Sequence, residues 1–569
     1  MESTGFVQQF FESSDNDIQD LEGSCEADIG SDIDLDIIDV DSSSDSDNSS
    51  DTDMRFEPVI VEVEGGHGWS HNFSDVMVNE FVCESGPKLP DVFDVNTASA
   101  FDYFSLFFTP EIFADISNHT NNYARWKIKQ MEANDTRWVE TTPEEIRAYI
   151  GINVLMGINY LPDTTMYWSP DSLIGNVGIQ NALSCNRFQK LNQYFHVSAR
   201  ENEPLVDDPN FDRLYKVRPI IDQVGEKFTK YYNLSREVYV VEAMAKFSRR
   251  LSFHQYIPVK RGKRGIKIWM LCDAQTAYLL RFDVYLGMHN TNNLAYNAVT
   301  KLTDNLHGYY HHIYFDNFFP SINLMEDLHA NGLYACGKVQ VNCKGFPQSL
   351  KNPEAIKNRG DYKILQKDGT NLTASVWRDK KNVYHLSTLS DPNLQMLVQR
   401  CVGPKLTPNI LYDPQPHAVY SYNKNMGGID RHDQLRTMYD VGRNSKRWWK
   451  YLFWFVLNSA IVNAFILYEC ASKRQTKKRY SHLDFRTELV KDLIRGYSSR
   501  KRSGVETDHH GLVKVEKAMG HINERISGRK RRCRYHLRQL KVRRETVYGC
   551  SVCGVHLCRD GCHNKFHNM

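Results

Sequence analysis

The sequence has no lysine or arginine before Arg55, although the whole 569-residue chain contains 70 of them. Asp and Ser dominate this first stretch, and no aromatic residue lies between Phe11 and Phe56. A segment with so little apolar surface cannot offset the entropy cost of ordering its backbone. We therefore predict an acidic, disordered region over residues 1–92, which offers a binding segment to chromatin or regulatory proteins.

The chain also lacks an apolar signal segment near Met1 and a run of 18 apolar residues that would span a membrane. The longest apolar stretch, 448–468, is interrupted by Lys450, Asn458 and Asn463, and we expect it to form a buried helix. Its aromatic residues are predicted to belong to the core and not to a surface that stacks on bases. These absences predict a soluble intracellular protein with no membrane partner.

Positive charge, absent at the start, gathers toward the end of the chain. The formal net charge is only +1, because 69 acidic residues balance the 70 basic ones. Five short basic clusters lie between Lys473 and Arg544. An acidic first part and a basic last part are typical of a protein with a nucleic-acid partner.

Cysteine is sparse along most of the chain, but five of the 13 cysteines lie between Cys533 and Cys562. In a reducing compartment such crowding favours metal ligands over disulfides. Close ligand pairs separated by a loop indicate zinc, and a segment this small needs metal to fold. Seven ligands exceed the four of one tetrahedral ion, so we predict two zinc ions, with His556 or His563 as the eighth ligand. The seven predicted zinc ligands are Cys533, His536, Cys550, Cys553, Cys558, Cys562 and His567.

Between the two ends, the periodicity of apolar residues separates helical from mixed regions. Thr142, Pro143 and Glu145 predict a helix start with a capping box, within a mainly helical region at 95–235. A β-rich insertion around a turn at 368–369 precedes a second helical region. Strand patterns lie at 238–241, 266–271, 278–286, 312–315 and 334–339, with a helix at 291–306.

Three acidic residues stand at positions suited to chemistry. Asp316 ends a short hydrophobic strand and is followed by Asn317, Phe318 and Phe319. Asp430 and Asp433 are spaced i and i+3, so a helix would place both carboxylates on one face. Each acid could equally be a helix cap or a turn residue, and the pattern alone leaves these alternatives open.

The chain carries ten short segments in a characteristic order from about residue 95 onward. They are Tyr167-Trp168-Ser169, Asn186-Arg187-Phe188, Tyr215-Lys216-Val217-Arg218-Pro219, Gln255-Tyr256-Ile257-Pro258, Gly265-Ile266-Lys267-Ile268-Trp269, Val284-Tyr285-Leu286-Gly287, Asp316-Asn317-Phe318-Phe319, Tyr422-Asn423, Gly427-Gly428-Ile429-Asp430 and Arg447-Trp448. Each is weak alone, but their order and spacing together are specific. Together they resemble the piggyBac transposase family.

This resemblance implies an α/β RNase H-like core of the DDE transposase type. In such a core, acidic residues hold two Mg²⁺ ions that align the attacking and leaving oxygens of phosphodiester chemistry. By resemblance, Asp316 is the second catalytic acid, Asp430 the third, and Asp433 an additional acid of the same helix. The implied domains are the N-terminal region (1–92), a helical dimerisation and DNA-binding domain (93–235 and 440–497), the core (236–341 and 417–439), a β-rich insertion (342–416), a basic linker (498–530) and a cysteine-rich zinc-binding domain (531–569).

The C-terminal segment resembles the cysteine-rich domain of the family, which reads the transposon end and usually has Cys in place of His536. We therefore predict contacts to double-stranded DNA here, first through phosphates and then through bases. A homodimer and a nuclear location follow from the same resemblance. The predicted DNA-binding residues are Arg529, Lys530, Arg531, Arg532, Lys541, Arg543 and Arg544.

The first catalytic acid of the family falls in a strand that ends Asp-Glu-x-Met, but here Val241 precedes Glu242. Valine has no ligand atom. Glu242 points to the opposite face of a strand, and Glu237 is four residues away, about 13 Å along the strand. Two further segments depart from the family pattern. Arg249-Arg250 stands where the family usually has Gly-Arg, and Thr276-Ala277-Tyr278 stands where it has Thr-Gly-Tyr.

These residues predict a transposase-derived, DNA-binding protein that is catalytically inactive. Two alternatives stay open. One is an active DNA transposase with an unconventional first ligand, which would require Mg²⁺. The other is a protein-interaction scaffold without DNA binding. Metal-dependent nicking separates the prediction from the first alternative, and salt-dependent duplex binding separates it from the second.

Overall fold

The structure is a computed structural model that describes 17 stretches of the chain between residues 68 and 567. The predicted acidic region up to residue 67, most of the predicted linker at 498–530 and the departures at 249–250 lie outside the described residues. The stretches are 68–130, 135, 137–199, 208, 211–246, 255–256, 264–287, 293–352, 356–402, 409–426, 429–442, 445–471, 480–498, 523–526, 529–550, 553–559 and 561–567.

Residues 68–92 form an extended arm, whereas we predicted disorder up to residue 92. Strand β1 (Trp69–Ser70) pairs with the main sheet, and the N–H of Asn79 donates to the Tyr334 hydroxyl at 2.8 Å. The prediction was wrong here because distant segments satisfy the arm's backbone groups, and composition does not reveal such partners. A second short pair joins β2 (Gly86–Pro87) to β3 (Tyr232–Asn233).

Helices that precede and follow the sheet in sequence pack together beside it. Their shared core contains Tyr103 and Phe104 of the first helix, Phe108 of the segment that follows it, and Phe453 and Phe485 of the last helices. The helices before the sheet are α2 (Ala100–Ser105), α3 (Pro110–Gln130), α4 (Pro143–Ile158), η1 (Thr164–Trp168), α5 (Val177–Ala182), α6 (Cys185–Tyr194) and α7 (Arg218–Lys230), and those after it are α13 (Trp448–Ala471) and α14 (His482–Ile494).

Helix α4 begins where the sequence predicts. Thr142 is its N-cap, its hydroxyl accepts from the N–H of Glu145, and Pro143 lies in the first turn. A capping box would also have the Glu145 carboxylate accept from the backbone N–H of Thr142. This carboxylate instead accepts from Nε of Arg187 at 2.9 Å. This buried ion pair joins α4 to α6, so the glutamate stabilises tertiary packing instead of its own helix end.

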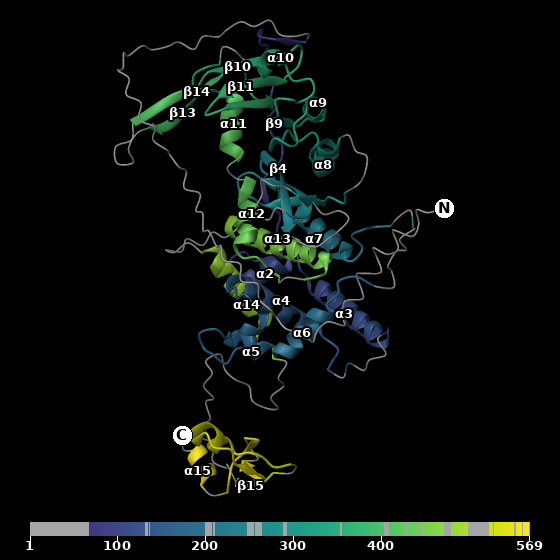
Figure 1. The fold of residues 1–569 in the computed structure, drawn as a ribbon, viewed down its shortest axis with the longest axis vertical. Coiled ribbons are helices and arrows are strands. Elements are labelled where there is room, and N and C mark those ends of the chain that lie inside the picture. The colour runs from purple at the N-terminus through teal and green to yellow at the C-terminus, as the bar shows by residue number, and fades with distance from the viewer. Residues whose placement is uncertain are drawn as a thin grey trace. The chain divides into compact units, whose positions relative to one another are not determined.

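One mixed β-sheet organises the middle of the chain (Figure 1). Its centre is parallel, because β4 pairs with β8 and β8 pairs with β9 in that sense, while β6 is antiparallel to β4. The insertion strands β10 to β12 continue this same sheet beyond β9. The order is β1-β10-β11-β12-β9-β8-β4-β6-β5, with β7 beside β6, and β13 and β14 form a separate hairpin. The strands are β4 (Glu237–Lys246), β5 (Gln255–Tyr256), β6 (Arg264–Asp273), β7 (Leu279–Val284), β8 (His312–Phe315), β9 (Tyr334–Val339), β10 (Tyr362–Lys367), β11 (Thr373–Arg378), β12 (Asn382–Ser387), β13 (Gln395–Val402) and β14 (Asn409–Pro416).

The predicted strands between 238 and 339 are all present, and their burial explains their composition. All four residues of β8 are buried, as expected of a parallel strand that is covered on both faces. The predicted turn at 368–369 joins β10 to β11, with Gly369 at a φ of +67° that favours glycine. The remaining helices of the region are α8 (Leu294–Thr303), η2 (Asp304–Leu306), α9 (Ile322–Ala330), α10 (Gln348–Lys351), α11 (His417–Met426) and α12 (Ile429–Met438).

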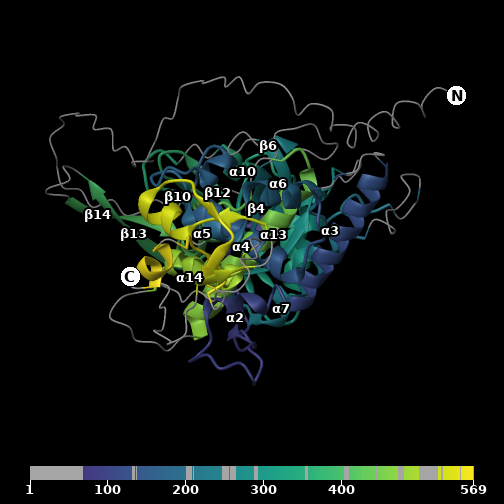
Figure 2. The ribbon, with the colours of Figure 1, turned by 90° about the horizontal axis from the view of Figure 1, so that it is seen from below.

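Helix α13 is the longest apolar helix of the described chain. It lies between the sheet and helices α2, α4 and α14 in Figure 1, and near the middle of the view from below in Figure 2. By length and composition alone it could cross a membrane, but 89% of its most apolar window is buried inside the protein. Trp449, Phe453, Trp454 and Phe455 are each at most 6% exposed. The prediction of a core helix is therefore confirmed.

A small unit with its own buried cluster lies near the C-terminus. Its buried residues are Leu557 and four cysteines, with Tyr535 and Phe566 packed against them. Its elements are β15 (Asn523–Arg525), β16 (Arg531–Arg532), η3 (His536–Leu540), β17 (Glu545–Thr546), β18 (Tyr548–Cys550), β19 (Val555–His556) and α15 (Cys562–His567).

Candidate functional sites

The carboxyl ends of β4 and β8 form the first candidate site. Val240 and Phe315 are the last paired residues of these parallel strands. One residue further on, Val241 and Asp316 therefore lie beside each other. Asp316 is exposed and its carboxylate accepts from the N–H of Asn317 at 2.7 Å. The register thus places Val241 next to the acid that the sequence singled out.

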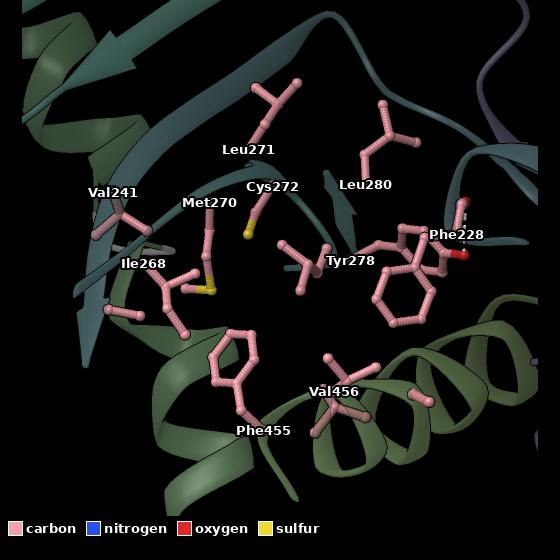
Figure 3. Close-up of a cluster of buried hydrophobic side chains, with 14 of the residues drawn as sticks. Phe228, Val241, Ile268, Met270, Leu271, Cys272, Tyr278, Leu280, Phe455 and Val456 are labelled. Atoms are coloured by element: carbon pink, nitrogen blue, oxygen red, sulfur yellow. Dashed lines mark hydrogen bonds between the residues drawn. The ribbon is translucent and has the colours of Figure 1, made fainter. Parts of the chain in front are cut away.

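Val241 belongs to the apolar core, as Figure 3 shows. It is 5% exposed and pairs across the sheet with Met270 of β6. Ile268 of the same strand and Phe455 of α13 complete the surroundings in the view of Figure 3. Position 241 therefore offers only methyl groups where a two-metal site would need a carboxylate oxygen.

The two glutamates of the same strand have other partners. Glu242 pairs across the sheet with Trp269, which is on the opposite face from Val241, and its carboxylate forms a buried ion pair with Lys267. Glu237 lies at the other end of β4, beside His312. Burial raises the pKa of Glu237, but its hydrogen bond and ion pair with Arg236 outweigh that effect and lower the pKa overall.

Helix α12 carries the other two predicted acids and lies against β4. Both Asp430 and Asp433 fall within its bounds, as their i, i+3 spacing predicts, although the side chain of Asp430 lies outside what the structure describes. The Asp433 carboxylate accepts from Nη2 of Arg436 at 2.5 Å, and the Arg436 side chain is only 6% exposed. The same guanidinium reaches the backbone oxygen of Met244 on β4 at 3.5 Å. Sequence reasoning did not identify this arginine partner.

The C-terminal unit brings its cysteines and histidines into two groups that could hold metal ions. In each group the ligand atoms lie within 4.8 Å of one another. The second group contains His563, one of the two candidates for the eighth ligand, and does not contain His556. Cys553, whose N–H donates to the Cys550 sulfur at 3.4 Å, lies beside this second group. The groups are Cys533, His536, Cys558 and Cys562, and Cys550, His563 and His567.

The spacing of the first group suits a tetrahedral ion. Nδ1 of His536 is 3.3 Å from the Cys533 sulfur, 3.6 Å from Cys558 and 3.3 Å from Cys562. Ligand bonds of about 2.0–2.3 Å in a tetrahedron would separate nitrogen and sulfur by about 3.5 Å. Burial raises the pKa of the Cys533 thiol, but hydrogen bonds from His536 and Cys558 outweigh it and bring the pKa to about 6. A thiolate is the form that binds metal.

On this unit, the first predicted basic run pairs with the residues that directly follow the second run. Strands β16 and β17 pair antiparallel, with Arg531 opposite Thr546 and Arg532 opposite Glu545. Glu545 also pairs with Arg543 at 3.2 Å. The seven predicted DNA-binding residues are all exposed, and we call them together the basic ribbon: Arg529, Lys530, Arg531, Arg532, Lys541, Arg543 and Arg544.

Known proteins resemble most of this chain. A family profile described as Transposase IS4 matches residues 99–465. The human PiggyBac transposable element-derived protein 5 is 27% identical over 453 residues, which are 76% of this chain and 82% of that protein. The human PiggyBac transposable element-derived protein 3 is 26% identical over 486 residues, 81% of this chain and 77% of that protein. A solved piggyBac transposase synaptic complex with hairpin DNA matches with a TM-score of 0.65 and 26% identity, over 84% of this chain and 98% of that one.

Proposed function

Because this chain belongs to the piggyBac-type transposase family, we propose that it is a transposase-derived protein that binds double-stranded DNA but no longer cuts it. The parallel centre of the sheet, with acids after its strands and on α12, supports an RNase H-like origin of the core. The single observation that carries the proposal is Val241, a buried hydrocarbon beside Asp316.

The donor set at the end of β4 does not fit a two-metal centre. Asp316 and Asp433 supply oxygens, but the first position supplies none, and Glu242 and Glu237 are engaged elsewhere. Loss of one of three essential ligands is expected to lower the rate of phosphodiester cleavage by about a thousandfold or more. We therefore assign the end of β4 no catalytic step.

A nicking assay tests the loss of activity. The full chain is incubated with supercoiled DNA and Mg²⁺, with an active transposase of the family as the positive control. We expect no nicking above the level of a matched Asp316→Asn variant. Metal-dependent nicking that disappears in Asp316→Asn would overturn the proposal, because it would show a working centre at this position.

The basic ribbon supports DNA binding by the C-terminal unit. Its exposed guanidinium and ammonium groups can neutralise phosphates and release counterions, which makes binding depend strongly on salt. Arg531 lies on β16, and Arg543 lies two residues before its partner strand β17. We expect duplex affinity to fall steeply between 50 and 200 mM salt, about 10³-fold if six phosphates are contacted. Salt-independent or absent binding would favour the scaffold alternative.

Zinc is the ion that the two ligand groups suit. Cysteine thiolates and imidazoles prefer zinc over hard cations, and four such ligands without an open position indicate a structural site. We infer one ion on Cys533, His536, Cys558 and Cys562, and a second on Cys550, Cys553, His563 and His567, which supports a zinc-finger-like module. Metal analysis of the purified chain is expected to give two zinc ions, and one for His563→Ala. No bound zinc would reject the assignment.

Three further properties are proposed from the family relationship. A homodimer, a nuclear location and recruitment of chromatin or regulatory proteins by the acidic N-terminal region suit a DNA-binding protein of transposase origin. An active transposase is the alternative that the nicking assay addresses.

A further inference from the structure

A row of residues crosses the sheet at the level of Asp316. Phe315 pairs with Val240 on one side and with Gly337 on the other, and both pairings are parallel. One residue further on, Val241, Asp316 and Lys338 therefore lie side by side, which we call the Asp316 row. Residues in register on neighbouring strands share a face of the sheet, so Lys338 is on the face of Asp316.

The ammonium of Lys338 lies close to this part of the face. Its Nζ is 5.0 Å from the centre of the Tyr422 ring, which α11 supplies. Burial and the charge of Asp316 both raise the pKa of Tyr422, so the Asp316 carboxylate also lies near that ring. A cation and a carboxylate from adjacent strands thus approach the same tyrosine.

Charge balance decides whether a divalent cation can bind here. Affinity for such ions rises with the number of carboxylates whose negative charge is not compensated. Basic residues approach the described carboxylates of this site. Arg436 donates to Asp433, and the register of β8 with β9, continued by one residue, puts Lys338 on the strand next to Asp316. The two cations thus compensate the charge of these two carboxylates and weaken their attraction for a divalent ion.

We propose that Lys338 excludes divalent cations from this end of the sheet, independently of the missing acid at position 241. The inference rests on the proposed function, which assigns position 241 to the first acid. If Val241 alone prevented metal binding, an aspartate at position 241 would be enough to restore it, but Lys338 changes this expectation. Restoring an aspartate at 241 leaves the site without metal, because the neighbouring ammonium still opposes the ion. Both positions have to change before a metal can bind.

Binding of Mn²⁺ to the full chain tests this inference, with the free ion measured by electron paramagnetic resonance. The key variants are Val241→Asp, Val241→Asp/Lys338→Met and Val241→Asp/Lys338→Arg. Methionine keeps an unbranched apolar stem without the charge, and arginine keeps the charge. We expect the methionine double variant to bind Mn²⁺ at least tenfold more tightly than Val241→Asp, and the arginine double variant to bind no better than Val241→Asp.

Two controls assign the ion to this site. Adding Asp316→Asn to the methionine double variant is expected to abolish the gain. Replacing Lys338→Met by Lys381→Met, in the exposed turn between β11 and β12, is expected to give no gain. Equal Mn²⁺ affinity for Val241→Asp with and without Lys338→Met would overturn the inference. So would a gain that survives Asp316→Asn.

The test remains decisive if a buried carboxylate at 241 prevents folding. Val241→Asn supplies an oxygen without charge, and circular dichroism confirms the fold before titration. The same tenfold comparison is then made with and without Lys338→Met. The outcome is separate from that of the proposed function, because nicking by the unmodified chain would reject the proposed function whatever the variants bind. Failure of the Lys338 comparison alone leaves the inactive, DNA-binding assignment intact.

Discussion

The two candidate metal sites of this chain depend on the surrounding fold in opposite ways. At the end of β4, a continuous apolar core fixes the strands, and Val241 is itself a member of that core. In the C-terminal unit, the buried cluster consists of Leu557 and four cysteines, three of which belong to one ligand group. The fold at the end of β4 therefore does not depend on a metal ligand, whereas in the C-terminal unit the candidate ligands themselves make up most of the buried cluster.

This difference explains why the valine is compatible with a stable protein. Burying a valine side chain contributes about 1.5–3 kcal/mol, whereas a buried carboxylate without a metal ion or cation partner is costly. In the proposed function, which involves no cutting, an apolar residue at 241 stabilises the sheet. The C-terminal unit has no comparable substitute, because removal of one ligand leaves too little apolar surface to hold its short strands.

Removal of a zinc ligand is expected to have the largest effect. Cys558→Ala leaves three ligands for the first ion, and folding of such small units is coupled to about 10–16 kcal/mol of zinc binding. We expect loss of one zinc, unfolding of the C-terminal unit and loss of duplex binding, measured by metal analysis and limited proteolysis. Cys470→Ser, at an exposed cysteine of α13, is the control. Two retained zinc ions with unchanged proteolysis would contradict the comparison.

Placing a carboxyl group at position 241 of the sheet is expected to lower the free energy of unfolding by less than the loss of a zinc ligand does. The size of this destabilisation is expected to depend on pH. Val241→Asp buries a carboxyl group at a cost of about 3–5 kcal/mol when it is ionised. Burial raises the pKa of such a group above its unfolded value near 4, so the destabilisation grows as pH rises above about 4. Urea unfolding at pH 5 and pH 8 measures it. Val241→Ala is the control, and it is expected to cost about the same at both pH values. A pH-independent loss for Val241→Asp would show that position 241 is solvated.

A buried histidine gives the sheet an acid sensitivity of its own. Burial, with a smaller contribution from Lys338, lowers the pKa of His385 to about 3. The unfolded value is near 6.5, so its contribution to stability is complete above that pH and is lost as pH falls toward 3. His385→Phe is expected to recover about 2 kcal/mol at pH 5 relative to pH 7.5, measured by urea unfolding.

The control for this prediction is His307→Gln, at an exposed histidine, which is expected to leave the pH dependence unchanged. Added zinc is also expected to leave the effect of His385→Phe unchanged, because the sheet is held by burial. Acid sensitivity that zinc relieves would place the responsible groups in the C-terminal unit. That result would mean that zinc binding in the C-terminal unit, and not burial in the sheet, determines the acid sensitivity.

Features encoded in neighbouring residues were predictable from the sequence. Thr142 caps α4 and Asp316 follows β8 because each depends on a short local pattern. Val241 lies on a strand next to the one that precedes Asp316, as predicted, because short sequence motifs mark the ends of both strands.

Features created by register between distant segments were not predictable. Lys338 joins the Asp316 row only through the pairing of β8 with β9. His563 and His556 had equal claims from spacing, and the fold of the C-terminal unit separates them. The arm at 68–92 is ordered by partners several hundred residues away, such as Tyr334 for Asn79.

The smallest expected effect separates surface from core within the C-terminal unit. Arg531→Ala removes an exposed charge from β16 and no ligand, so zinc content and resistance to proteolysis are expected to stay unchanged. Duplex affinity is expected to lose about one unit of its logarithmic salt slope, measured by anisotropy titrations from 50 to 200 mM salt. Arg359→Ala is the control, because Arg359 already pairs with Asp379 at 2.8 Å on the insertion. An unchanged slope for Arg531→Ala would move the DNA contact away from the basic ribbon, while loss of zinc would show that this surface residue also supports the metal-held core.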